Sequence, residues 1–132
     1  MASICYCSSL RAAARKTSAF YDAALAPVGI NVAQFALLRR IERAGTVSLT
    51  ELGRLAELDR STVGRNAKVL ERLGLIRLEA AEDHREAAVT LAPAGVEALV
   101  RAAPKWEEAQ RYVEAALGAD GAHALRTLAN RL

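Results

Sequence analysis

The sequence predicts a mainly α-helical fold with one small β-hairpin, and three observations support this prediction. Of the 132 residues, 52% are hydrophobic but only 5% are aromatic, and the excess of alanine and leucine favours helices. Apolar residues recur every three or four positions along most of the chain, as on one face of a helix. The pattern changes to that of strands only in residues 75–79 and 87–91.

The composition predicts a single folded domain, residues 1–132, located in the cytoplasm. The length suits one domain, and the apolar content beside 25% charged residues argues against disorder. No apolar run approaches the roughly 18 residues of a membrane span, so we expect no membrane association. The N-terminal MASICYCSS lacks the pattern of a signal peptide, and two cysteines do not make a secreted disulfide framework.

The net charge is mildly positive and unevenly distributed. A formal charge of +3 with a pI near 9.2 does not by itself predict nucleic-acid binding. Residues 1–85, however, carry four more basic than acidic side chains, whereas residues 86–132 carry one fewer. Positive charge therefore concentrates in the part of the chain that also contains the candidate DNA-binding helix described below.

Two helices are expected at the start of the chain. The first covers residues 8–26 and ends before Gly29. The second covers residues 32–44, with Asn31 as its N-cap. Residues 46–48 are long enough only for a strand fragment.

The next two helices form a helix-turn-helix. Ser48 and Glu51 make a capping box at the start of a short helix over residues 49–57. After a three-residue turn, Asp59 caps a second helix within residues 59–74. Its apolar stripe consists of Val63, Ala67, Leu70 and Leu73. A short helix, a tight turn and a second capped helix are typical of this motif.

The second helix of the motif carries polar side chains opposite its apolar stripe. These are Ser61, Thr62, Arg65, Asn66, Lys68 and Arg72. Arginine can pair bidentately with guanine, asparagine with adenine, and serine or threonine with phosphates or base edges. The pattern fits a helix in the major groove of double-stranded DNA. Taken alone, it fits an ordinary amphipathic helix with a solvated face equally well.

The two strands at 75–79 and 87–91 form a hairpin with a charged tip at 81–86. Behind a helix-turn-helix, such a hairpin is a wing, and Arg85 at its tip can enter the negative potential of the minor groove. The alternative is a solvated hairpin in which Asp83 and Arg85 pair with each other.

The C-terminal third is expected to be helical. One helix covers residues 93–117, with Pro93 in its first turn and Pro104 expected to kink or break it. A turn at 118–121 precedes a last helix over 121–131.

These C-terminal helices carry more apolar residues than one small domain can cover. We therefore assign residues 30–92 to a winged helix-turn-helix unit. Residues 1–29 and 93–132 are assigned to an N- and C-terminal helical dimerisation layer.

In the order of its elements and in its residues, the chain resembles the MarR family of winged helix-turn-helix transcriptional regulators. The matching stretches are residues 29–43 and 49–95. The family's wing reads Asp-x-Arg, three residues, then Val-x-Leu-Thr-x-x-Gly. This chain has Asp83, Arg85, Val89, Leu91 and Gly95, with Ala92 where threonine is usual. The departure removes one helix cap and leaves the wing pattern intact.

The resemblance implies an obligate homodimer that binds a pseudo-palindromic operator, usually as a repressor. Carried over residue by residue, it assigns Ser61, Thr62, Arg65 and Asn66 to the major groove, Arg85, oriented by Asp83, to the minor groove, and Lys68 and Arg60 to phosphates.

The resemblance also implies release from DNA by a small phenolic or carboxylate effector, or by cysteine oxidation. Tyr21, Phe35 and Trp106 are candidates to line an effector pocket, and each is alternatively plain core. Cys5 and Cys7 are the candidates for oxidation, because nearby basic residues can lower a thiol pKa. They could instead bridge between subunits, bind a soft metal with help from a histidine, or have no role.

An enzyme is not expected. The two histidines lie far apart in sequence, and no phosphate-binding loop, metalloprotease motif or nucleophile elbow is present. We therefore expect no catalytic residues, metal site or cofactor. The alternative function is a helical dimer that acts as a protein-interaction module without DNA binding.

Overall fold

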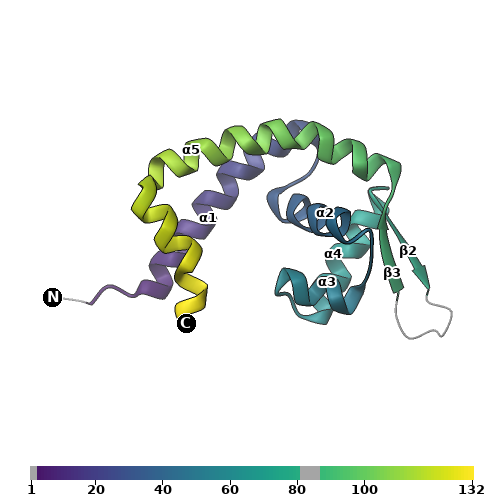
Figure 1. Ribbon diagram of the computed structural model, residues 1–132, viewed down its shortest axis with the longest axis horizontal. Coiled ribbons are helices and arrows are strands. Elements are labelled where there is room, and N and C mark those ends of the chain that lie inside the picture. The colour runs from purple at the N-terminus through teal and green to yellow at the C-terminus, as the bar shows by residue number, and fades with distance from the viewer. Residues whose placement is uncertain (1–2, 81–86) are drawn as a thin grey trace.

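The computed structural model describes residues 3–80 and 87–132. Its elements are α1 (Tyr6–Leu25), the 3₁₀ turn η1 (Ala26–Val28), α2 (Val32–Ala44), β1 (Thr46–Ser48), α3 (Leu49–Ala56), α4 (Arg60–Arg72), β2 (Ile76–Ala80), β3 (Ala87–Leu91) and α5 (Pro93–Arg131). Figure 1 shows α1 and α5 running together away from a group formed by α2, α3, α4 and the strands. The predicted fold class, mainly helical with a small wing, is confirmed.

The three strands form one antiparallel sheet in the order β1-β3-β2. Val89 at the centre of β3 pairs with Val47 on one side and Leu78 on the other, and its side chain is fully buried. The strand fragment expected at residues 46–48 is therefore β1, which adds a third strand to the hairpin of β2 and β3. It is stable at three residues because β3 supplies its hydrogen-bond partners, which no local pattern reveals.

The core lies where α2, α3, α4 and the sheet meet the end of α1 and the first turns of α5. Its largest fully buried side chains are Leu25, Leu38, Ile41, Leu52, Leu70, Val63 and Val89. Burying a side chain of this size contributes about 1.5–3 kcal/mol. This core holds α4 in place, so that its opposite face is free for contacts outside the domain.

Side-chain caps define where the helices begin. Asn31 caps α2 and forms a full capping box with Gln34, because each side chain accepts from the other's backbone amide at 2.9 Å. Ser48 caps α3 by accepting from the Glu51 amide at 3.1 Å. The second half of the expected box is missing, because the Glu51 carboxylate instead forms an ion pair with Arg54.

Close contact between α3 and α4 depends on Gly53. A Cβ atom at this position would lie 3.0 Å from the carbonyl oxygen of Leu58 and 3.2 Å from Cγ1 of Val63. The turn itself passes through Glu57, whose φ of 56° is left-handed. Glycine at position 53 thus allows the two helices to approach closely enough for a helix-turn-helix.

Two expectations about helix ends need correction. Leu73, placed on the buried stripe of α4, is 50% exposed, because the helix ends at Arg72 and Gly74 turns the chain with a φ of 77°. Of the kink or break expected at Pro104, the break does not occur, because α5 continues through this residue. A helix can absorb a proline by bending when packing on either side supports it.

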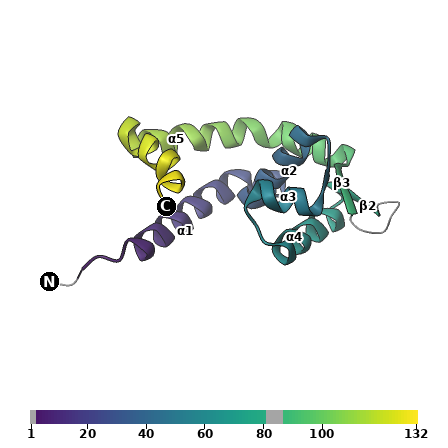
Figure 2. The same cartoon turned by 60° about the horizontal axis from the view of Figure 1, so that its bottom comes forward.

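The break in α5 occurs instead at Gly118, whose φ of 72° and ψ of 167° are not helical. This agrees with the turn expected from residue 118. Figures 1 and 2 show the segment after the break folding back toward α1. Within the described residues no single helix is long and apolar enough to cross a membrane. Only α1–η1 and α2 taken together, bent by 70°, reach that length and composition.

Candidate nucleic-acid interface

The start of α4 is organised by Asp59. Its Oδ1 accepts hydrogen bonds from the Thr62 amide at 2.8 Å and from the Ser61 hydroxyl at 2.9 Å. These bonds, that of the Thr62 amide above all, hold the pKa of Asp59 below its ordinary value. A charged cap next to free helical amides is favourable. Asp59 therefore orders the first turn of α4, where the candidate DNA contacts Ser61 and Thr62 lie.

The buried side of α4 determines which residues face outward. Val63, Ala67 and Leu70 are completely buried. The outer face of α4 is a stripe of exposed side chains at spacings of four, three and four, which we call the α4 stripe: Ser61, Arg65, Lys68 and Arg72. Spacings of this kind keep side chains on one face of a helix.

The other predicted contacts of α4 are less exposed. Thr62 and Asn66 are half-buried and lie on the flank of the α4 stripe. The Arg65 guanidinium donates to the Thr62 hydroxyl at 3.4 Å, which links stripe and flank. Arg72 shares the stripe but was not assigned a DNA contact from the sequence, although its spacing from Lys68 is the signal that places it there.

A cationic hollow of about 430 Å³ runs beside this stripe. It is lined by Arg65, Lys68, Val69, Glu71 and Arg72. Three basic side chains against one acidic side chain make the hollow attractive to an anion such as a phosphate.

Arg60 is placed differently from the stripe. Its Nη1 donates to the hydroxyl of Thr50 on α3 at 2.8 Å. Arg60 thereby ties the start of α4 to the first turn of α3 and orients one helix of the motif against the other. A phosphate contact would have to be made in addition to this bond.

The wing is anchored through Gly95 in the first turn of α5. A Cβ atom at Gly95 would lie only 2.1 Å from the carbonyl oxygen of Leu75, and the same oxygen accepts from the Ala92 amide at 3.0 Å. Glycine at position 95 thus lets α5 begin directly against the start of β2. Asp83 and Arg85, the predicted wing-tip contacts, lie outside the described residues.

Comparisons with known proteins agree with this geometry. The family model described as MarR family matches residues 28–86. The Mycobacterium tuberculosis transcriptional regulator MosR, whose crystal structure in complex with DNA is known, is 35% identical in sequence to this chain. The match covers 96% of this chain and 92% of MosR, with a TM-score of 0.88. This chain belongs to the MarR family.

Two further solved structures are similar to this chain, although no curated protein matches it. A probable transcriptional regulator from Pseudomonas aeruginosa is 30% identical over 92% of each chain, with a TM-score of 0.81. A mutant MarR from Escherichia coli in complex with operator DNA is 20% identical over 92% of this chain and 89% of that one. Its TM-score of 0.82 shows a shared fold.

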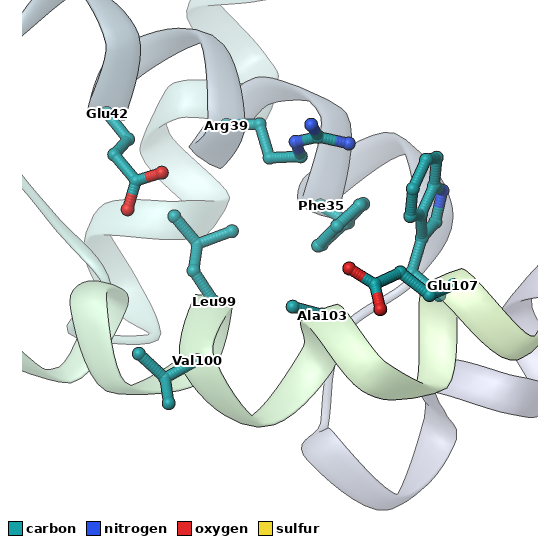
Figure 3. A pocket seen from close by; sticks show the side chains of 8 residues that line it. Phe35, Arg39, Glu42, Leu99, Val100, Ala103 and Glu107 are labelled. Carbon is teal, nitrogen blue, oxygen red and sulfur yellow. The ribbon is translucent and has the colours of Figure 1, made fainter.

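In this MarR-family chain, two of the three predicted effector-pocket residues come together. Phe35 on α2 and Trp106 on α5 lie with ring centroids 5.7 Å apart and line a pocket of about 300 Å³ (Figure 3). Arg39, one turn after Phe35, lies over both rings, with its Cζ 4.8 Å from the Trp106 centroid and 5.5 Å from that of Phe35. The sequence-based prediction missed Arg39, although its spacing from Phe35 indicates a shared face.

Tyr21 does not line this pocket. It is buried between α1 and α5, where its hydroxyl donates to Oε1 of Gln110. Burial, and after it the charge of Glu114, raises the pKa of Tyr21. Tyr21 therefore joins two long helices, which the apolar periodicity of α1 did not distinguish from a place in a pocket.

The two cysteines lie at the exposed start of α1 as free thiols. Cys5 is the N-cap residue, and hydrogen bonds from the side chain and backbone of Ser8 lower its pKa. The cause is thus the first helical turn and not the basic residues farther along α1 that the sequence suggested. Among the described residues, no group of three or more histidine, cysteine or acidic side chains could hold a metal ion.

Proposed function

We propose that this chain is a transcriptional repressor that binds a pseudo-palindromic operator in double-stranded DNA as a homodimer. The observation that carries the proposal is the α4 stripe, an exposed row with three cations on the second helix of a helix-turn-helix. The 35% identical MosR has been crystallised with DNA. We extend that partner to this chain, together with a cytoplasmic location and a function that requires no catalysis.

We propose that some residues of α4 contact bases and others contact phosphates. Arg65 and Asn66 are proposed to read bases in the major groove, with Ser61 and Thr62 beside them. Lys68 and Arg72, at the cationic hollow, are proposed to contact phosphates.

The remaining contacts lie outside the α4 stripe. We propose a further phosphate contact for Arg60. Arg85, oriented by Asp83, is proposed to enter the minor groove on the basis of the sequence pattern. The helix in the major groove would then supply most of the specificity, and the cations most of the affinity.

The dimer is proposed to form through α1 and α5, that is, through the segments at 1–29 and 93–132, with residues 30–92 as the winged unit. These two segments expose large apolar side chains: Ile4, Tyr6, Leu10, Phe20, Tyr112, Leu117, Leu125 and Leu132. Phe20 stacks on Tyr112 with centroids 4.7 Å apart while both remain partly exposed. A monomer rarely leaves so much apolar surface in water, and a second copy of the same surface would cover it.

Two routes of release are proposed. The pocket at Phe35 and Trp106 joins α2 of the winged unit to α5, so an effector that fills it would change how the DNA-binding unit sits on the dimer. Oxidation of Cys5 and Cys7 is the second route. Two thiols would lose two electrons and two protons to hydrogen peroxide, form one disulfide and leave two water molecules.

The alternative, a protein-interaction dimer without DNA binding, is not favoured. A protein-interaction role does not account for a row of exposed cations on the second helix of the motif, beside a hollow that suits phosphate. A chain that had lost DNA binding would not be expected to keep this row of cations, because a solvated face tolerates most polar residues.

A gel shift at one fixed salt concentration tests the proposal, with DNA from upstream of the chain's own gene. We expect retention that Arg65→Ala with Lys68→Ala abolishes and that Arg111→Ala, an exposed arginine of α5 away from α4, leaves unchanged. Retention lost on mild peroxide treatment, but kept in the Cys5→Ser, Cys7→Ser variant, would support oxidation. Equal retention of all variants, or none on any DNA at low salt, would contradict the repressor.

A further inference from the structure

Gly64 lies in the interior of α4, where glycine is unfavourable. At such a position it costs up to about 1 kcal/mol relative to alanine, because folding takes away more of its conformational freedom. Two structural reasons can offset this cost: a left-handed backbone, or a neighbour that leaves no room for a Cβ atom. Neither applies to Gly64. Its φ is not positive, and within residues 3–80 and 87–132 an added Cβ atom would meet nothing within 4 Å.

The chain has eight glycines, and the others differ from Gly64 in this respect. Four of them have a left-handed backbone: Gly29, Gly45, Gly74 and Gly118. A Cβ atom at Gly53 or Gly95 would press against a backbone carbonyl oxygen, at 3.0 and 2.1 Å respectively, and one at Gly121 would lie in ordinary contact with a side chain at 3.5 Å. In the described part of the chain, Gly64 alone combines an ordinary backbone with empty space, so a partner outside the chain is the remaining reason for it.

Gly64 lies on the side of α4 that carries candidate DNA contacts. Arg60 and Ser61 lie one turn before it and Lys68 one turn after it, so these side chains surround the position. At about 100° per residue, Gly64 lies about 70° from the middle of the α4 stripe, whereas Asn66 lies about 130° from it on the other side. Gly64 is therefore nearer to the stripe than a residue proposed to read bases. Its backbone is partly exposed, and Figure 2 shows α4 along the outer edge of the winged unit.

The surface that Gly64 offers is small and apolar. Its amide is bonded within the helix, because only the amides of the first helical turn lack an intrahelical partner. A phosphate would therefore find no hydrogen-bond donor at this position. The apolar group that base pairs present in the major groove is the C5-methyl group of thymine. Without a side chain at position 64, the helix backbone can approach such a methyl group closely.

We infer that Gly64 is a specificity-determining residue, whose missing side chain makes room for the methyl group of one thymine in each half-site of the operator. The inference rests on the proposed function, because it requires α4 to lie in the major groove. A Cβ atom at position 64 would occupy the place of this methyl group. Gly64→Ala should therefore raise the stability of the protein and weaken its binding to the operator. A purely structural role would not move these two quantities in opposite directions.

Two matched changes test the inference, since one adds a methyl group to the protein and the other removes one from the DNA. Gel shifts at one salt concentration compare the unmodified protein with Gly64→Ala on the operator fragment from upstream of the chain's own gene. Further copies of this fragment carry deoxyuridine, which lacks the methyl group, in place of thymine at one symmetric pair of positions each.

On the thymine operator, Gly64→Ala should bind more weakly by on the order of tenfold for each half-site, about 1.4 kcal/mol. Deoxyuridine at the contacted pair should restore most of this affinity. The same replacement should weaken binding of the unmodified protein by about fourfold for each methyl group that is no longer buried. Deoxyuridine at the other pairs is the matched control and should not restore binding of the variant. Urea denaturation of Gly64→Ala verifies that its fold is intact.

Three results would overturn the inference: unchanged affinity of Gly64→Ala for the operator, an equal loss on DNA of unrelated sequence, or a loss that no deoxyuridine restores. Each of them would leave the repressor standing, because the unmodified protein would still bind its operator. Absence of DNA binding by the unmodified protein would overturn both proposals together.

Discussion

Replacing Gly95 by alanine should destabilise the attachment of the wing to α5. The added Cβ would lie 2.1 Å from the Leu75 carbonyl oxygen and 3.1 Å from its carbon, and 3.3 Å from Cδ2 of Leu91. Ordinary contact requires at least about 3.5 Å, so the backbone of residue 75 must shift by more than about 1 Å. Since backbone cannot rotate away as a flexible side chain can, the strain must be taken up by β2 or by the start of α5.

The magnitude follows from three contributions. Overpacking of this kind costs about 1–3 kcal/mol. Weakening the bond from the Ala92 amide to the Leu75 oxygen, now 3.0 Å, costs about 1 kcal/mol. The better helix propensity of alanine returns up to about 1 kcal/mol. The free energy of unfolding should therefore fall by about 1–3 kcal/mol.

Gly64 offers a matched control, because it is also a helical glycine but a Cβ atom there meets nothing within 4 Å. Gly64→Ala should raise the free energy of unfolding by up to about 1 kcal/mol. Urea denaturation of both variants at one protein concentration measures the difference. If Gly95→Ala were as stable as the unmodified protein, or if both variants lost the same stability, the steric argument would be refuted.

Four further predictions concern DNA binding and assembly. Arg65→Ala should weaken operator binding by about 1–3 kcal/mol and non-specific binding less; equal losses would make Arg65 a phosphate contact. Arg85→Ala should weaken operator binding by a similar amount without unfolding the protein, and an unchanged Kd at fixed salt would contradict the wing assignment. Because hydrogen bonds lower the pKa of Asp59 in the folded state, its contribution to stability is present above the unfolded pKa and is lost as the pH falls through the folded pKa. Asp59→Ala should thus flatten the acid side of a stability–pH curve, and an identical curve would exclude this role. Deletion of residues 118–132 should disrupt the dimer in analytical ultracentrifugation; an unchanged dimer would argue against the assigned dimerisation layer.

The helix-turn-helix and the outer face of α4 could be predicted from local sequence alone. Asn31, Ser48 and Asp59 cap their helices as predicted, and Gly74 turns the chain after α4. These features depend on interactions within one helical turn, so a few neighbouring residues suffice to specify them. The α4 stripe follows from the same periodicity, because the buried positions of one helix also define its exposed ones.

Tertiary structure decided which residues from distant parts of the chain meet. Phe35 and Trp106 form one pocket while Tyr21 joins α1 to α5, although all three aromatics looked equivalent in the sequence. Arg39 acquires its position only because Trp106 arrives from α5, and Gly95 is required only because Leu75 passes next to it. Such contacts depend on how whole helices pack, which periodicity within a single segment does not specify.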